Sequence, residues 1–194
     1  MRLVLASASP RRAELLRSAG FTFEVVPADV DERVHDGETA RSYVRRLAVE
    51  KSAAAWAAVA SGFGRSDDVI VLAADTAVVI DGEILGKPRD ERDAAMMLRK
   101  LSGRRHEVMT GVSLRSSAGE RGLVETTGVY MEELTDEDVA WYVESGEGRD
   151  KAGGYGIQGL ASRFIPRIDG SRDNVVGLPV AGVLILIGEL ASAG

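Results

Sequence analysis

The stretch VIVLAADTAVVI, residues 69–80, places one aspartate inside an otherwise apolar run. Apolar side chains without alternation are typical of a strand that is covered on both faces of a sheet. Asp81-Gly82 then predicts a hairpin turn into a short strand over residues 83–85. Desolvating an ionised carboxylate is costly unless cations or donors compensate it. Asp75 therefore indicates either a break in the strand, where Asp and Thr satisfy local backbone groups, or a functional site.

The segments around this stretch read as further strands and helices. Ser9 and Pro10 predict a helix start, with an N-cap hydroxyl and a proline at the first helical position. Residues 39–61 predict a long alanine-rich helix, and Lys51 falls on its apolar face, so its stem must run along the core. The other expected strands are residues 2–6, 21–26, 106–115, 123–132 and 160–168, and the other expected helices are residues 91–101, 135–145 and 178–188.

The grouping of strands predicts the fold class. Residues 106–115 and 123–132 form a pair joined by the polar loop SSAGER, which argues against a purely alternating doubly wound sheet. We therefore predict a mixed α/β fold. A chain of 194 residues with 45% hydrophobic content can bury most of its surface as one compact domain over residues 1–194, with room for two lobes.

Composition limits the classes of partner. The net charge of −6 opposes a general nucleic-acid or anionic-membrane surface, so any positive site must be local. Without cysteine, neither a disulfide framework nor a thiolate zinc site is possible. The longest apolar stretch, residues 178–188, is too short to span a bilayer and reads as a buried helix. We expect a cytoplasmic protein that binds neither nucleic acid nor membrane.

Several familiar motifs are excluded by their context. Residues 154–159 satisfy G-x-G-x-x-G, but a polar helix end precedes them and a strand-like segment follows, the reverse of a dinucleotide-binding unit. No P-loop motif is present. His35 and His106 are not spaced as a ligand pair, and a structural or surface role is favoured for both.

The first turn of the first helix carries two positive charges. Arg11 and Arg12 stand where the helix macrodipole disfavours cations by a few tenths of a kcal/mol to about 1 kcal/mol. A charged first turn is usually a solvated face. Yet a helix N-terminus with Ser7, Ser9 and two guanidinium groups also matches a polyphosphate site. Further cations stand in a stiff turn at Lys87 and at the entrance of the glycine-rich segment at Lys151.

The chain resembles the Maf family of nucleoside triphosphate pyrophosphatases from about residue 3 to residue 180. The resemblance rests on six segments in order: SASPRRAELL, AADT, GKP, LSGRRHEVMTGV, KAGGYGIQG and VVGLP. One departure is Ala74, where glycine is common in the family. The resemblance implies a mixed twisted sheet with flanking helices, two lobes around a cleft as in the inosine-triphosphate pyrophosphatase architecture, and often a homodimer.

The same resemblance implies an activity and a site. It implies a divalent metal, Mg²⁺ or Mn²⁺, and water attack at the α-phosphate that yields a monophosphate and pyrophosphate. Asp75 matches the proton acceptor, and Glu32 matches a cleft position that serves phosphate or metal binding. We expect Asp75 to orient and deprotonate the water or, with Glu32, to hold the metal that does so. The positions associated with base specificity are Arg11, Thr76 and Gln158, and those that serve phosphate binding are Ser7, Arg12, Lys51 and Lys87. From its place at the entrance of the glycine-rich segment, we expect Lys151 to bind phosphate as well.

KAGGYGIQG further resembles the dTTP/UTP pyrophosphatases within the family. The Gln158 amide has donor and acceptor faces that complement the edge shared by uracil and thymine, although a rotated amide also suits cytosine. Two other classes remain open: a nucleotide-binding regulator of septum formation, and a phosphohydrolase that removes one phosphate at a time.

Overall fold

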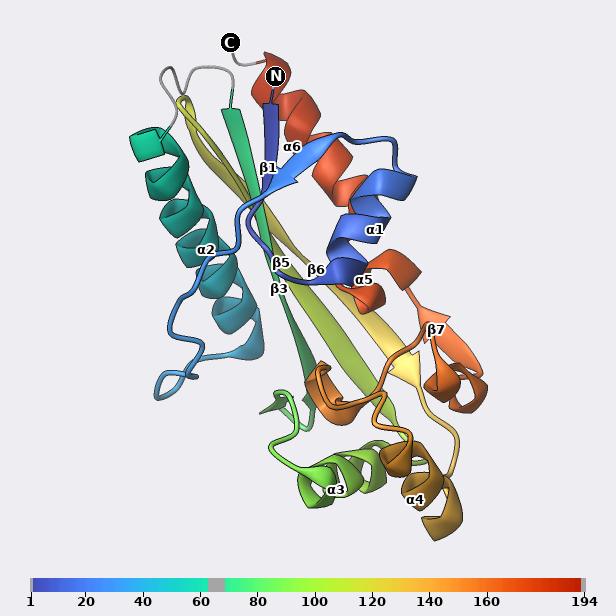
Figure 1. Ribbon diagram of the computed structural model, residues 1–194. Helices are drawn as coiled ribbons and strands as arrows, with labels where there is room; N and C mark the ends of the chain where they lie inside the picture. The colour runs from blue at the N-terminus through green and yellow to red at the C-terminus, as the bar shows by residue number, and fades with distance from the viewer. Residues whose placement is uncertain (1, 63–68, 193–194) are drawn as a thin grey trace. The chain divides into compact units, whose positions relative to one another are not determined.

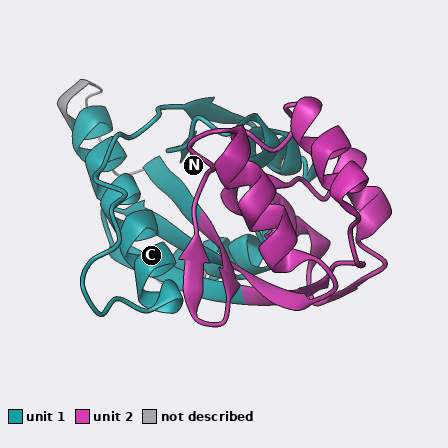
Figure 2. Ribbon diagram, turned by 90° about the horizontal axis from the view of Figure 1, so that it is seen from below, with its two compact units in different colours: residues 1–75, 110–125, 177–194 teal, residues 76–109, 126–176 magenta. Residues whose placement is uncertain are grey.

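The computed structural model describes residues 2–62 and 69–192, and the chain forms two compact units (Figure 2). Unit 1 comprises residues 1–75, 110–125 and 177–194, and unit 2 comprises residues 76–109 and 126–176. The strands are β1 (Arg2–Leu5), β2 (Phe23–Val25), β3 (Val69–Ile80), β4 (Glu83–Leu85), β5 (Arg105–Ser116), β6 (Gly119–Tyr130) and β7 (Arg167–Asp169). The α-helices are α1 (Pro10–Ser18), α2 (Ala40–Gly62), α3 (Glu91–Leu101), α4 (Asp136–Glu144), α5 (Arg172–Val176) and α6 (Val180–Ser192).

The strands form one mixed sheet in the order β2-β1-β3-β5-β6-β7, with β4 paired to β3 (Figure 1). β1 pairs in parallel with β2 and with β3, whereas β4 pairs antiparallel with β3 and β7 antiparallel with β6. Parallel pairs need crossover segments, and α1 and α2 supply them. The predicted mixed α/β class with flanking helices is therefore confirmed.

In unit 1 the sheet is covered on both faces, as the apolar run of β3 predicted. Ile70, Leu72 and Ala74 pack in a cluster with residues of α1 and α6. Val71 and Ala73 point to the opposite face and pack in a cluster with residues of α2. Figure 1 shows α2 on one side of these strands and α1 and α6 on the other. Because side chains alternate along a strand, each face of β3 serves a different helix layer.

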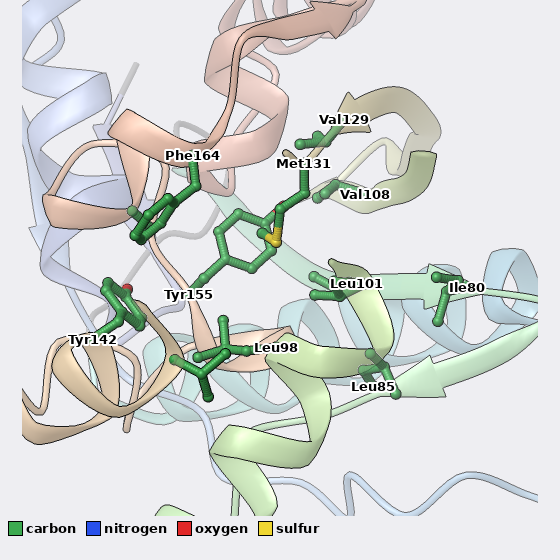
Figure 3. Packing of buried hydrophobic residues seen from close by; sticks show 13 residues of the cluster. Ile80, Leu85, Leu98, Leu101, Val108, Val129, Met131, Tyr142, Tyr155 and Phe164 are labelled. Carbon is green, nitrogen blue, oxygen red and sulfur yellow. The ribbon is translucent and has the colours of Figure 1, made fainter. Parts of the chain in front are cut away.

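Unit 2 has a core of its own, built around two tyrosines and a phenylalanine. Figure 3 shows Tyr142, Tyr155 and Phe164 within this cluster. Tyr155 is 5% exposed, and its hydroxyl oxygen lies 2.6 Å from His106 Nε2. The ring of His106 is itself only 2% exposed, so the structural role favoured for this histidine is confirmed.

Most helix and turn predictions are confirmed. α2 and α3 fall where expected, and α4 begins at N-cap Thr135 with a complete capping box. Asp81 and Gly82 both have positive φ, 53° and 77°, as the hairpin turn between β3 and β4 requires. Pro10 opens α1, but Ser9 makes no side-chain cap hydrogen bond, so that part of the prediction is wrong.

Two predictions about strand bounds need correction. The loop SSAGER is much tighter than expected, because β5 continues to Ser116 and β6 starts at Gly119. The predicted strand over residues 160–168 is instead the 3₁₀ helix η2 (Leu160–Phe164) followed by the short β7. The Glu147 carboxylate accepts the backbone N–H of Leu160 at 2.7 Å, which removes that donor from any strand pairing.

The C-terminal apolar stretch is a helix, as predicted, but it is not wholly buried. In α6, Val183 and Leu186 lie in the unit 1 core, whereas Leu184 and Ile185 are 51% and 63% exposed. No helix within residues 2–62 and 69–192 combines the length and the apolar character that crossing a bilayer needs.

Candidate functional site

Asp75 lies in the middle of β3, and the strand runs through it without a break. Of the two alternatives for Asp75, the strand break is therefore excluded. Counting from Val71 and Ala73, Asp75 takes the face of β3 that α2 covers. On α2, Lys51 continues the buried stripe of Val44 and Leu47, as its spacing predicted. The two elements thus point a carboxylate and an ammonium group at one another.

The Lys51 ammonium group binds two carboxylates. Lys51 Nζ lies 2.6 Å from Asp75 Oδ1 and 2.5 Å from Glu32 Oε1. Lys51 and Asp75 are each 8% exposed, whereas the Glu32 side chain is 50% exposed. One cation therefore joins a buried acid to an acid that faces solvent.

Tyr43 holds the segment that carries Glu32. Its hydroxyl group donates a hydrogen bond to the backbone carbonyl oxygen of Glu32 at 2.9 Å. Burial, together with the nearby negative charges of Asp75 and Glu32, raises the pKa of Tyr43 to about 12. Tyr43 therefore stays a protonated donor at neutral pH.

Arg12 is fixed beside these acids by two hydrogen bonds. Its Nε donates to the carbonyl oxygen of Gly177 at 2.8 Å, and its Nη1 donates to Ser7 Oγ at 3.1 Å. Burial lowers the pKa of the Arg12 guanidinium group, and the Asp75 and Glu32 carboxylates oppose this effect. Arg11 adds a second positive charge nearby, which also lowers that pKa.

The protonation of Asp75 reflects the same balance. Burial raises the pKa of the Asp75 carboxyl group, and the positive charges of Lys51 and Arg12 lower it. The net direction is upward, so Asp75 is a stronger base than an exposed aspartate. A buried carboxylate flanked by cations can accept a proton while the cations bind anionic oxygen atoms.

The position of α2 is set by close contact with the β5–β6 hairpin. A Cβ atom on Gly111 would stand 2.2 Å from the Val44 carbonyl oxygen, so only glycine allows α2 this close. Beside Lys51 in the chain, Ser52 Oγ lies 2.8 Å from Ser113 Oγ, which donates to Glu120 at 2.6 Å. These contacts fix the position along β3 at which the Lys51 side chain lies.

Among the described residues, no cluster of three or more acidic or histidine side chains could hold a metal ion by itself. Glu32 and Asp75 are the two predicted metal ligands, and both carboxylates face the same ammonium group. Mg²⁺ is commonly held by one or two carboxylates together with substrate phosphates, rather than by a complete protein cage. The donor set therefore fits a metal that binds with its substrate.

The two predicted phosphate-binding lysines of unit 2 lie on loops. Lys87 is exposed in the turn after β4, where the Gly86 carbonyl oxygen accepts the Gly153 N–H at 3.0 Å. The Lys151 ammonium group is bound by the Glu147 carbonyl oxygen and, at 2.7 Å, by Asp150 Oδ1. Lys151 thus folds back on its own loop.

The base-specificity candidates are divided between the units. Arg11 belongs to unit 1, and Thr76 and Gln158 belong to unit 2. Thr76 is partly buried and follows Asp75 directly, so its side chain leaves β3 on the opposite face. Gln158 is exposed within the tight segment Gly156–Gly159.

The structure brings together six predicted residues within unit 1: Ser7, Arg11, Arg12, Glu32, Lys51 and Asp75. Sequence reasoning missed Tyr43, although it lies eight residues before Lys51 and four before Leu47, the helical spacing that found Lys51. It also missed Glu147, because no local pattern links a loop carboxylate to an amide 13 residues later.

The solved structure of the Ham1 protein of Staphylococcus aureus superposes with a TM-score of 0.48 at 18% identity, covering 68% of this chain and 72% of that one. A dTTP/UTP pyrophosphatase of Anaeromyxobacter dehalogenans strain 2CP-C is 51% identical, over 96% of this chain and 92% of that protein.

Other relatives and the family model agree. A dTTP/UTP pyrophosphatase of Hahella chejuensis is 47% identical over 97% of this chain and 92% of its own length. Another, from Vibrio vulnificus strain YJ016, is 49% identical over 92% of this chain and 93% of its own length. The family model described as Maf-like protein matches residues 2–190. The chain therefore belongs to the Maf family.

Proposed function

We propose that this protein is a nucleoside triphosphate pyrophosphatase that hydrolyses dTTP and UTP to the monophosphate and pyrophosphate. The observation that carries the proposal is the buried Asp75 carboxylate, held by Lys51 and flanked by Arg12. The names of the relatives at about half identity supply the substrate class.

Asp75 acts on the attacking water. Burial has raised the pKa of this carboxyl group, so it accepts a proton more readily than an exposed aspartate. Lys51 holds Asp75 Oδ1 at 2.6 Å, which fixes the direction of the carboxylate. The second oxygen, Oδ2, is then available to orient the water toward the α-phosphorus.

Arg12 binds the phosphates. Its guanidinium group is held in place through Nε and Nη1, so its positive charge lies at a fixed point where anionic oxygen atoms can bind. Ser7 lies against Arg12 at the start of α1, where backbone N–H groups favour negative charge. Charge accumulates on the departing pyrophosphate, so these groups stabilise the transition state more than the ground state.

A divalent cation, Mg²⁺ or Mn²⁺, belongs to the proposal. Glu32 and Asp75 would hold it, and when bound it lowers the pKa of water and screens phosphate charge. The Glu32 side chain is half-exposed, so it reaches solvent, whereas Asp75 is buried; a metal that arrives with substrate would meet Glu32 first.

For the residues of unit 2 the proposal follows the sequence-based expectations. Lys87 and Lys151 bind phosphate, and Thr76 and Gln158, together with Arg11, select the base. A glutamine amide offers one donor and one acceptor face, which matches the N3–H and carbonyl edge of uracil and thymine.

Product analysis tests the reaction. The purified protein is incubated with UTP, dTTP, CTP and GTP in Mg²⁺ and in Mn²⁺, and pyrophosphate and orthophosphate are both measured. Pyrophosphate with UTP and dTTP preferred is the expected result. Orthophosphate would indicate removal of one phosphate at a time, and binding without turnover in either metal would favour a nucleotide-binding regulator.

Asp75→Asn tests the catalytic assignment. Turnover is expected to fall on the order of 10²-fold or more, because the amide cannot accept the proton. Asp29→Asn, an exposed acid in the segment before Glu32, serves as the control and should leave turnover unchanged. Unchanged turnover in Asp75→Asn would remove this residue from the mechanism.

Two further proposals concern assembly and location. The homodimer implied by the resemblance is tested by sedimentation of the purified protein, where a monomer at all concentrations would refute it. A cytoplasmic location is proposed from the acidic composition and the absence of cysteine, and cell fractionation tests it.

A further inference from the structure

The tetrapeptide Gly156–Gly159 is held at both ends by a pair of bonded side chains. At its start, the Gly156 N–H donates to the Tyr142 hydroxyl oxygen at 3.1 Å. Just past its end, the Leu160 N–H donates to Glu147 Oε2 at 2.7 Å. Tyr142 and Glu147 are joined to each other at 2.8 Å through Glu147 Oε1. We call this arrangement the Tyr142–Glu147 clasp.

Each group in the clasp has one hydrogen-bonding role. A carboxylate only accepts, so the Tyr142 hydroxyl must donate its proton to Glu147. Burial raises the pKa of Tyr142, which keeps that proton in place. The tyrosine oxygen is then left to accept from Gly156. No other assignment of donors and acceptors satisfies the hydrogen bonds of Tyr142, Glu147 and Gly156.

The glycines of the segment let the main chain lie close to the side chains of Glu147 and Lys151. A Cβ atom on Gly159 would stand 2.1 Å from Glu147 Oε2, closer than any real Cβ contact. On Gly156 it would stand 2.8 Å from the Lys151 stem, whose ammonium group binds the Glu147 carbonyl oxygen. The main chain therefore lies directly against Glu147 at Gly159 and against the Lys151 stem at Gly156.

The two residues inside the clasp have opposite environments. Ile157 is only 7% exposed, whereas the next residue, Gln158, is exposed. With the backbone pinned on either side and Ile157 buried, the Cα–Cβ direction of Gln158 is fixed. An exposed glutamine otherwise has many rotamers and loses entropy when it binds a ligand.

We propose that Glu147 and Tyr142 are positioning residues for base selection, which act by holding the backbone that aims Gln158. The proposal rests on the proposed function, because it assumes that Gln158 reads a nucleobase. It assigns to Glu147 an effect on the choice between bases, whereas a purely structural carboxylate would affect all substrates alike.

The test compares the ratio of kcat/KM for UTP to that for CTP. Glu147→Gln is expected to lower this ratio about tenfold, the lower end of what one pocket contact contributes to discrimination. Tyr142→Phe, which removes one hydroxyl group, should also lower the ratio of kcat/KM for UTP to that for CTP. Glu144→Gln, the same change at an exposed position three residues earlier, is the matched control and should leave the ratio unchanged.

A double variant distinguishes an effect on the position of Gln158 from a general loss of activity. Because the clasp acts through Gln158, Glu147→Gln combined with Gln158→Ala should give the same ratio as Gln158→Ala alone. Ratios that multiply, or equal losses for UTP and CTP in Glu147→Gln, would overturn the proposal.

Hydrogen exchange tests whether the Tyr142–Glu147 clasp holds the backbone, and this test does not depend on enzyme activity. The Gly156 and Leu160 amides should exchange faster in Glu147→Gln than in the wild type or in Glu144→Gln, and unchanged exchange would overturn the proposal. A wild-type protein that releases no pyrophosphate refutes the proposed function instead, so the two failures are distinguishable.

Discussion

Gly111→Ala is predicted to displace α2 and to reduce activity at a distance from the reacting atoms. The added Cβ would stand 2.2 Å from the Val44 carbonyl oxygen and 2.5 Å from its carbonyl carbon. Both are backbone atoms, so no side-chain rotation relieves the contact. Ordinary contacts begin at 3.4 Å, so α2 must retreat by about 1 Å.

Two effects follow from that movement. Overpacking of this kind costs about 1–3 kcal/mol of unfolding free energy. Lys51 lies on the same helix, seven residues beyond Val44, and moves with it relative to Asp75. A misplacement of about 1 Å lowers catalysis on the order of 10²-fold.

Urea unfolding and pyrophosphate release from UTP measure the two effects. Gly188→Ala is the matched control, because a Cβ there meets nothing within 4 Å beyond the local helix backbone. The control should be unchanged in activity and slightly more stable, by about 0.5–1 kcal/mol. Wild-type stability and turnover in Gly111→Ala would refute the account of how Lys51 is positioned.

Three other predictions test separate contacts. Tyr43→Phe should raise the Mg²⁺ concentration needed for half-maximal activity, because the segment carrying Glu32 loses its anchor; an unchanged metal titration contradicts this. Thr135→Ala should lower the unfolding free energy by about 1 kcal/mol through loss of the α4 N-cap, with wild-type KM. Burial lowers the pKa of His106 to about 4 from an ordinary 6.5, so the unfolded chain binds more protons between these values. Stability should therefore fall by roughly 3 kcal/mol as pH drops from 6.5 to 4, and His106→Gln should flatten that dependence in urea titrations.

Local periodicity predicted where the elements run and which of their faces are buried. The spacing of Val44, Leu47 and Lys51 identified the core face of α2, and the apolar run identified β3. It did not predict that α2 covers the odd-numbered face of β3, because that depends on contacts between residues far apart in sequence. For the same reason, the sequence alone does not distinguish a strand break from a functional site at Asp75.

The failures have local physical causes. Residues 160–164 carry apolar side chains that suit a strand, but the Glu147 carboxylate binds the Leu160 N–H and the segment turns into a 3₁₀ helix. α5 is only five residues long and is too short to show a helical period. In the first case a contact with a residue distant in sequence overrides the strand propensity. In the second case the helix is too short for its period to be recognised.

Within the site, residues of an unusual type for their surroundings were better indicators of function than the spacing of residues. A buried lysine and a buried aspartate were each anomalous in sequence, and the structure pairs them at 2.6 Å. Tyr43 attracts no notice in sequence because a tyrosine on a helix is ordinary, and its role appears only through its bond to the Glu32 backbone.

The most direct test of the central claim is hydrolysis of UTP in ¹⁸O-labelled water, with the products separated and weighed by mass spectrometry. The account predicts one labelled oxygen atom in the monophosphate and none in pyrophosphate, because Asp75 directs water to the α-phosphorus. Label in pyrophosphate or in orthophosphate would contradict it.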